Sequence, residues 1–319
     1  LGQVKTVWYA PTGLLHRIAF AAIAPETGQP LVKTYDLRLT GSTREVVFRR
    51  PLPGNAIHTA LLIGGIEYAA DSLCLAQAGR AQNSNETPLP VPELVVERGG
   101  CEMGPVPALP GTRKETDSLA AKLHKRMYVR LLQGCEAREE QIKKVGDPKA
   151  ADTPPPGLIH VATHGFFCDD PIYAAGDKPV PGKLPLLRSG LLMAGSQRVR
   201  MGKMPFKNME DGVLYASEIA ELDLGGTKVV VLSACETALG TIRGGEGVYG
   251  LPLAFRLAGA EHVIMSLWQI NDAETVLFME TLYRHWQAEI DIRAAFLAAQ
   301  RELQAAGKGE ELWGAFVLI

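Results

Sequence analysis

A histidine and a cysteine each follow a short apolar run, and together their side chains could carry out nucleophilic catalysis. Residues 158–162 (LIHVA) lead, after one threonine, to His164 and Gly165, whereas residues 229–234 (VVVLSA) lead directly to Cys235. In an open α/β sheet, groups at the carboxyl ends of strands line the binding crevice. A thiolate at Cys235 could attack an acyl carbon there while the imidazole of His164 handles the protons.

The same two residues also have a purely structural interpretation. Free cysteine is among the most buried residue types, and a histidine at a strand end often has only a structural role. The separation of 71 residues (235 − 164) does not argue against a catalytic pair, because such partners meet in space rather than in sequence. The residues alone therefore leave both interpretations open.

Short apolar runs recur along the chain and alternate with longer stretches of helical spacing. Such runs are typical of buried strands, and their alternation with helices is typical of a mainly parallel sheet covered by helices. We therefore expect an α/β fold with strands in residues 4–9, 60–63, 158–162, 191–194, 228–234, 262–267 and 315–319.

Residues 112–132 are expected to form a surface helix. Thr112 and Glu115 have the spacing of a capping box, in which the two side chains bond to backbone N–H groups at the start of a helix. The apolar residues that follow at helical intervals are Leu119, Leu123, Met127 and Leu131.

Length, composition and charge exclude several classes of protein. The 319 residues suffice for about two units at roughly 150 residues per domain. A composition of 46% hydrophobic and 21% charged residues is that of a globular protein. The net charge of −2 gives no basic excess, so we expect no direct nucleic-acid partner. No apolar run approaches the ~20 residues that span a bilayer, so we expect no membrane anchor.

The cysteines indicate a reducing environment. They are five in number, widely spaced and without a C-x-x-C pair: Cys74, Cys101, Cys135, Cys168 and Cys235. From this odd number and spacing we expect neither a disulfide framework nor a zinc ribbon, and we expect an intracellular, cytoplasmic location.

Four stretches of the sequence resemble the CHAT family of caspase-like cysteine peptidases, which is related to caspases, legumain and separase. They are HVATHGFF (160–167), RSGLLMAG (188–195), DGVLYASEIAELDLGGTKVVVLSACETALG (211–240) and GGEGVYGLPLAFRLAGAEHVIMSLWQIND (244–272). The resemblance also includes residues 7–23, 108–123 and 313–319, so it covers essentially the whole chain. The resemblance implies a caspase-like α/β sandwich with a mainly parallel central sheet. It also implies two units, a pseudo-caspase-like half with the surface helix (1–150) and a catalytic half (151–319).

The resemblance assigns roles to individual residues. His164 matches the family's general acid/base and Cys235 its nucleophile. The family's oxyanion hole of backbone N–H groups would fall on Gly165 and Cys235. A glycine after the histidine fits this role, because it lets a peptide approach the backbone closely. No acidic third member of the catalytic group is assigned.

The function implied is that of a cysteine endopeptidase that cuts another protein through a thioacyl-enzyme. The chain starts at Leu1 rather than Met, so we expect a piece of a longer protein. The resemblance to the CHAT family implies that this protein is bacterial and that a sensor domain or partner controls the peptidase. A long loop expected at residues 168–185 could be ordered by such a partner. The alternatives are a catalytically silent interaction scaffold, disfavoured because His164 and Cys235 are both intact, and a transferase that uses the same acyl-enzyme.

Asp272 and Ser233 are candidates for a specificity pocket. The words SLWQIND, which end at Asp272, are similar to the separase segment that supplies an acidic pocket residue, and this implies a preference for Lys or Arg before the cut. Ser233 lies two residues before Cys235, where relatives place an acid, and this departure weakens the case for a basic preference. Asp272 could alternatively cap a helix that opens at Ala273.

Three competing motifs are disfavoured. His160-x-x-x-His164 has zinc-site spacing for a helix, but on a strand the two side chains would lie about 13 Å apart. The G-x-G-x-x-G of residues 245–250 does not directly follow a strand, as dinucleotide binding would require. No G-x-S-x-G nucleophile elbow is present. We therefore expect no metal and no organic cofactor.

Overall fold

The structure is a computed structural model of the chain, and it describes most but not all residues. The described ranges are 4–11, 15, 18–25, 28–40, 46, 57–80, 104–145, 147, 155–167, 186, 189–233, 250–268, 270–286 and 291–319. Cys235 and the expected loop at 168–185 lie outside these ranges. For Asp272, the structure describes the backbone but not the side chain. Within the described ranges, every helix is too short or too polar to cross a membrane.

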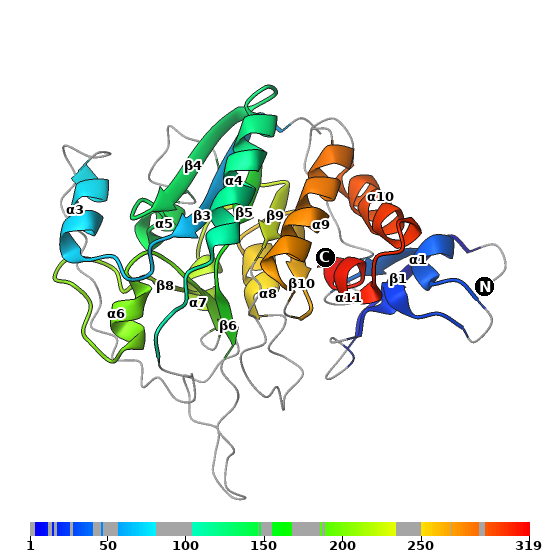
Figure 1. Cartoon of the computed structure of the whole chain (residues 1–319), viewed down its shortest axis with the longest axis horizontal. Coiled ribbons are helices and arrows are strands. Elements are labelled where there is room, and N and C mark those ends of the chain that lie inside the picture. The colour runs from blue at the N-terminus through cyan, green and yellow to red at the C-terminus, as the bar shows by residue number, and fades with distance from the viewer. Residues whose placement is uncertain are drawn as a thin grey trace, which may run out of the picture.

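A central six-stranded sheet has the order β11-β10-β9-β5-β3-β4 (Figure 1). Its strands are β3 (Thr59–Ile66), β4 (Tyr128–Gly134), β5 (Leu158–Val161), β9 (Val229–Leu232), β10 (His262–Ser266) and β11 (Phe316–Leu318). All neighbours pair in parallel except β10 and β11, which are antiparallel. The expectation of a mainly parallel sheet is confirmed.

Two smaller sheets accompany the central one. One contains the antiparallel strands β6 (Gly165–Phe167), β7 (Ser189–Leu192) and β8 (Val213–Tyr215). The other pairs β1 (Thr6–Tyr9) with β2 (Asp36–Leu39) in parallel. Because β6 starts four residues after β5 ends, the first small sheet extends from the strand end that carries His164.

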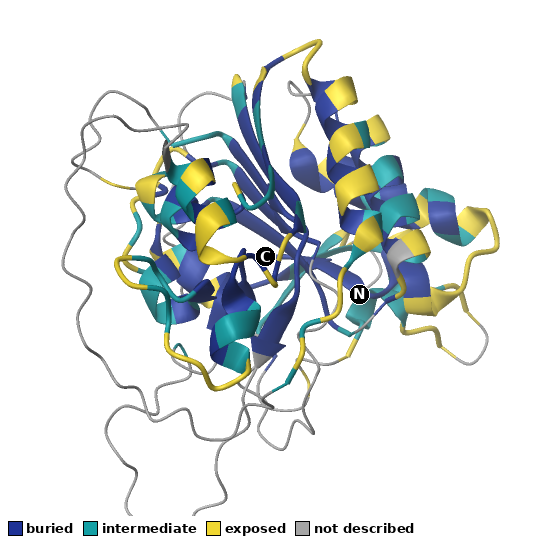
Figure 2. Cartoon of the chain, turned by 60° about the vertical axis from the view of Figure 1, so that its left-hand side comes forward, coloured by how far each residue is buried: buried dark blue, intermediate teal, exposed yellow. Residues whose placement is uncertain are grey.

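Helices cover both faces of the central sheet, as Figure 2 shows by the buried strands between two layers. One face packs on α4 (Pro110–Leu123), α9 (Asp272–His285), α10 (Ile292–Ala305) and α11 (Glu310–Trp313). The other packs on α5 (Glu139–Val145), α7 (Ala216–Ile219), α8 (Gly250–Leu257) and the β6-β7-β8 sheet. The other helices of the described residues are η2 (Phe20–Ala22), α1 (Leu31–Thr34), α3 (Ser72–Arg80) and α6 (Ser196–Arg200). This is the α/β sandwich that the sequence predicts.

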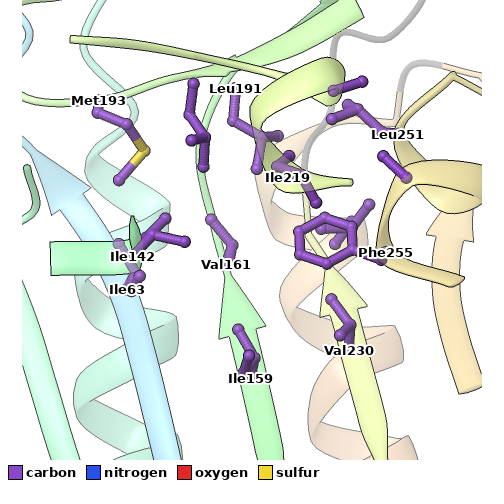
Figure 3. Packing of buried hydrophobic residues seen from close by; sticks show 14 of the residues in the cluster. Ile63, Ile142, Ile159, Val161, Leu191, Met193, Ile219, Val230, Leu251 and Phe255 are labelled. Atoms are coloured by element: carbon purple, nitrogen blue, oxygen red, sulfur yellow. The ribbon is translucent and has the colours of Figure 1, made fainter. Parts of the chain in front are cut away.

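Alternation along β5 decides which side chains enter which layer. Ile159 and Val161 belong to the α5-α7-α8 layer, whereas Leu158 lies in the α4-α9-α10 layer and His160, of the same parity, faces it too. Figure 3 shows residues of the α5-α7-α8 layer, among them Ile159, Val161, Leu191, Ile219, Val230 and Phe255.

The helix expected at 112–132 is shorter than predicted. Helix α4 ends at Leu123, and the chain turns into β4 at Tyr128. Thr112 lies inside the helix and donates its hydroxyl proton to the Leu109 carbonyl (2.7 Å), and Glu115 is buried, so the expected capping box is wrong. The wrong prediction arose because residues of the turn and of β4 continue the helical spacing by coincidence.

The two expected units, 1–150 and 151–319, both contribute strands to the central sheet. β3 and β4 come from the first range, and the remaining four strands come from the second. The sheet therefore continues across residue 150, and the division itself stays a prediction.

Cys74 and Cys135 form a disulfide with their Cα atoms 5.9 Å apart. The bond joins α3 to the turn that follows β4, so it ties together the segments beyond two neighbouring parallel strands. The expectation that the cysteines form no disulfide is wrong for this pair, because a sequence separation of 61 residues gives no local sign that the two strands are adjacent. The expectation of a reducing environment loses its main support, and a cytoplasmic location stays a prediction.

An ionic cluster around the buried Glu139 fastens α5 to the segment that leads into β8 and to α7. The ammonium of Lys143 lies 2.6 Å from Glu139, 3.0 Å from Glu210 and 2.7 Å from Glu218. The second oxygen of Glu139 accepts the Gly212 N–H (3.0 Å). Burial, together with the charge of Glu218, holds the pKa of Glu139 well above its usual range despite the opposing effect of Lys143.

Glu139→Gln should therefore change how stability depends on pH. A carboxyl whose pKa is raised by folding contributes fully below its ordinary pKa, and the contribution is lost as the pH rises through the folded-state value. The free energy of unfolding of the wild type should fall relative to Glu139→Gln as the pH rises from about 4.5, by up to about 1.4 kcal/mol per pH unit. Urea unfolding at pH 5 and pH 8 measures this, with Glu140→Gln as the neighbouring control. Parallel pH curves for the wild type and Glu139→Gln would contradict it.

Candidate functional site

The register of β5 and β9 places two expected site residues after equivalent positions. These strands are parallel neighbours, and Val161 pairs with Leu232. His164 is the third residue after Val161, and Cys235 is the third residue after Leu232. Just beyond the last paired position of β9, the Ser233 N–H donates to the Val161 carbonyl (2.9 Å), so the two segments are still hydrogen-bonded to each other there. The structure thus brings the approach to Cys235 beside the strand that leads to His164.

The imidazole of His164 is held by a backbone carbonyl. Its Nε2 lies 2.7 Å from the carbonyl oxygen of Pro107, and the residue is 2% exposed. A carbonyl oxygen only accepts hydrogen bonds, so Nε2 carries the proton of the neutral ring. Nδ1 is then the ring nitrogen that can accept a proton. Pro107 precedes α4 and is 57 residues from His164 in sequence.

The backbone around His164 is fixed from two sides. Its carbonyl accepts the Leu192 N–H (2.9 Å), and its N–H donates to the Tyr68 hydroxyl oxygen (3.3 Å). Thr163 donates its hydroxyl to the Leu192 carbonyl (2.5 Å), which leaves the Thr163 oxygen to accept from the Tyr68 hydroxyl (3.0 Å). The rings of Tyr68 and His164 also pack, with centroids 5.1 Å apart. Tyr68 therefore supports both the backbone and the ring of His164.

Tyr68→Phe should destabilise the fold by about 1–2 kcal/mol. The ring contact would survive, but the His164 N–H and the Thr163 hydroxyl would each lose a buried partner, and an unsatisfied buried polar group carries a penalty of this size. Urea unfolding measures the change. Tyr128→Phe is the control, because Tyr128 is 71% exposed and should shift stability by less than about 0.5 kcal/mol. Equal stability of Tyr68→Phe and wild type would contradict the support assigned to this hydroxyl.

Gly165 opens β6 and pairs with Leu191 of β7. The bond from the Leu192 N–H to the His164 carbonyl marks Gly165 and Leu191 as a pair that does not exchange hydrogen bonds. The Gly165 N–H consequently points away from β7. Since β6 is an edge strand of the described β6-β7-β8 sheet, this N–H also points away from that sheet.

Ser233 is buried, and its hydroxyl donates to Oε2 of Glu115 (3.0 Å). The other oxygen of Glu115 lies 2.9 Å from Nε2 of His160. Nδ1 of His160 is 3.0 Å from the hydroxyl of Tyr283 on α9. These four residues link α4, β5, the end of β9 and α9 in one buried polar network.

Asp272 is the first residue of α9, and its side chain is not described. The N-cap of this helix is Asn271, whose side chain accepts the Glu274 N–H (2.9 Å). The alternative interpretation of Asp272 as the cap is therefore wrong by one residue, because the helix includes Asp272. β10, which leads to this helix, lies next to β9 in the sheet.

Sequence reasoning missed three residues around the site. Pro107 and Tyr68 gave no signal, since one acts through its backbone and the other through a hydroxyl on a distant strand connection. Glu115 gave a misleading signal through its capping-box spacing. Among the described residues, no group of three or more His, Cys, Asp or Glu side chains could hold a metal ion, and His160 and His164 have different partners.

The mainly parallel sheet between two helical layers, with His164 beyond β5 and Cys235 beyond its neighbour β9, defines a caspase-like α/β protein. The chain belongs to the CHAT domain family, a caspase-like family whose model matches residues 1–319, the whole chain. Among proteins of curated function, none matches the chain.

Proposed function

We propose that the chain is a cysteine endopeptidase with Cys235 as nucleophile and His164 as general acid/base. The observation that carries the proposal is the register of β5 and β9, in which Val161 and Leu232 are partners, because His164 and Cys235 each follow these partners by three residues in the sequence. Neighbouring strands are roughly 5 Å apart, so the two chains leave the sheet within reach of each other. Membership of a caspase-like family supports the same assignment.

The proposed reaction has two steps. The Cys235 thiolate attacks the peptide carbonyl carbon, and the resulting oxyanion accepts hydrogen bonds from the N–H groups of Gly165 and Cys235. Protonated Nδ1 of His164 gives its proton to the leaving amine, which yields a thioester. His164 then removes a proton from water, and the hydroxide attacks the thioester. The C–S bond breaks, Cys235 leaves as a thiolate, and the carboxylic acid product releases its proton to solvent to become a carboxylate. The Pro107 carbonyl supports this cycle because it stabilises the Nε2 proton of His164 throughout.

The biological setting is part of the proposal. The substrate is another protein, and the peptidase is the effector part of a larger regulated bacterial protein in the cytoplasm, controlled by a sensor domain or partner outside this chain. A silent caspase-like scaffold would keep the fold without the thiolate chemistry. A transferase would share the acyl-enzyme but pass the acyl group to an amine instead of water.

A peptide carrying an electrophilic group at its carboxyl end tests the chemistry. The wild type should form a covalent adduct at Cys235, located by peptide mass spectrometry, and His164→Ala should slow its formation. Cys101 and Cys168 in the same digest are internal controls and should remain unlabelled. Absence of an adduct at Cys235 would favour the scaffold, whereas an adduct followed by transfer of the acyl group to an added amine would favour the transferase.

Substrate preference should depend on Asp272. Its position at the start of α9, after the strand next to β9, supports a pocket carboxylate that binds Lys or Arg before the cut. A carboxylate in a shielded pocket distinguishes a cation from an apolar side chain by several kcal/mol, so Asp272→Ala should reduce cleavage after basic residues by at least about tenfold. A peptide library measures the preference. Ser233 is not assigned a direct contact with substrate, since its hydroxyl binds Glu115. An acidic or apolar preference in the wild type would refute the assignment.

A further inference from the structure

We infer that Glu115 is a positioning residue that holds the ends of β5 and β9 in the arrangement the active site needs. The inference deepens the proposed function and rests on it. Glu115 does not touch the substrate in this scheme. It acts through Ser233, two residues before Cys235, and through His160, four residues before His164.

The geometry singles out the Glu115 carboxylate. One of its oxygens contacts His160 of β5 at 2.9 Å, and the other accepts the hydroxyl of Ser233 at 3.0 Å. Glu115, His160 and Ser233 are 2%, 0% and 2% exposed. A single side chain on α4 therefore contacts both segments that lead to the proposed catalytic residues. It does so from the face of the sheet covered by α4 and α9.

Hydrogen bonds and one close ionic contact make up the network. The Ser233 hydroxyl donates to Oε2 of Glu115, and Nδ1 of His160 lies 3.0 Å from the Tyr283 hydroxyl. Nε2 of His160 and Oε1 of Glu115 are 2.9 Å apart but do not have the alignment of a hydrogen bond. Burial and the charge of Glu115 raise the pKa of Tyr283 well above its usual range, so this hydroxyl keeps its proton. The Ser233 hydroxyl thus has a defined acceptor on α4, and a buried hydrogen bond to a carboxylate restrains the residue that donates it.

Chain connectivity carries this restraint to Cys235. Two residues span at most about 7 Å, so a fixed Ser233 confines the nucleophile to a small region beside β5. The Ser233 N–H bond to Val161 supplies one restraint and the hydroxyl bond to Glu115 supplies a second. If the second is lost, the thiol can move away from the imidazole that favours its ionisation, and a displacement of about 1 Å can reduce a rate 100-fold.

Ser233→Ala and Glu115→Gln test the inference through two readouts. The first readout is alkylation of Cys235 by iodoacetamide between pH 5 and pH 10, followed site by site with mass spectrometry, which does not require proteolysis. In Ser233→Ala we expect the midpoint of this pH profile to rise by about one unit, equivalent to a tenfold lower rate at pH 7. The second is peptide cleavage, where kcat should fall about tenfold with KM unchanged. The double variant should be no worse than the worse single variant, because both substitutions act on the same contact between Ser233 and Glu115.

Ser118→Ala is the matched control. Ser118 also lies on α4 and also donates to a glutamate, Glu280 of α9 (3.2 Å), but this contact does not reach the strand ends. The Ser118→Ala variant should therefore have the wild-type alkylation profile and the wild-type rate of peptide cleavage. A Ser233→Ala protein that folds with an unchanged alkylation profile would overturn the inference even if the wild type is an active peptidase. If the wild type shows no proteolysis but the alkylation profile of Ser233→Ala is shifted relative to that of the wild type, the proposed function is refuted and the positioning role is still supported. If Glu115→Gln does not fold, Ser233→Ala alone decides.

Discussion

Cys235→Ala should reduce proteolysis at least about 1,000-fold, and His164→Ala should do the same. In the proposed reaction the thiolate forms the new bond to carbon and the imidazole moves every proton, so neither works without the other. The double variant should consequently be scarcely slower than either single variant. Initial rates on a fluorogenic peptide, measured at saturating enzyme over hours, give the three values.

Matched controls separate loss of chemistry from loss of fold. Cys101→Ala and Cys168→Ala remove thiols that have no assigned role and should retain wild-type rates. Thermal unfolding should show that Cys235→Ala stays folded. His164→Ala also loses the ring contact with Tyr68, so its stability must be measured alongside its rate. Retained cleavage in Cys235→Ala would rule out this nucleophile.

Removal of the disulfide should produce the largest change in stability. Cys74 and Cys135 close a loop of 61 residues, and loop-closure entropy then predicts a loss of up to about 4 kcal/mol in the double variant Cys74→Ser/Cys135→Ser. Dithiothreitol should lower the urea midpoint of the wild type toward that of the variant. It should have no effect on the variant itself, which serves as the control.

Counting thiols provides an independent check. In the denatured but unreduced wild type, at most three of the five cysteines should react with a thiol reagent (5 − 2 = 3), and all five should react after reduction. Five reactive thiols without a reductant would contradict the bond. Such a result would also restore the original argument for a reducing environment.

The sequence predicts five of the six central strands, because each of these five is a short and mostly buried apolar run. Seven strands overlap the predicted ranges: β1, β3, β5, β7, β9, β10 and β11. β4 was missed because Met127 and Leu131 fall at helical spacing from Leu123, although the chain turns between them. Periodicity describes a local stretch and carries no information about where a turn of a few residues intervenes.

Local patterns place His164 at a strand end but cannot provide its surroundings. Pro107 and Tyr68 contact it across 57 and 96 residues of sequence, and Glu115 reaches Ser233 across 118. Such contacts depend on which strands are neighbours, and strand order is a property of the whole fold. Glu115 is instructive, since the local rule for a helix start accounted for it fully and concealed its role in the core.

The contact between Pro107 and His164 has a consequence for mutational scanning. The group that orients the imidazole is a peptide carbonyl, and every amino acid has one. Substitutions at position 107 would therefore register as mild wherever the local backbone path is kept, and a scan would rank the site as tolerant. Insertions or deletions between Gly104 and the start of α4 should score as severe, because they move the carbonyl itself. A scan that finds substitutions at position 107 tolerated, but changes in the length of the segment before α4 not tolerated, would be the genetic signature of this contact.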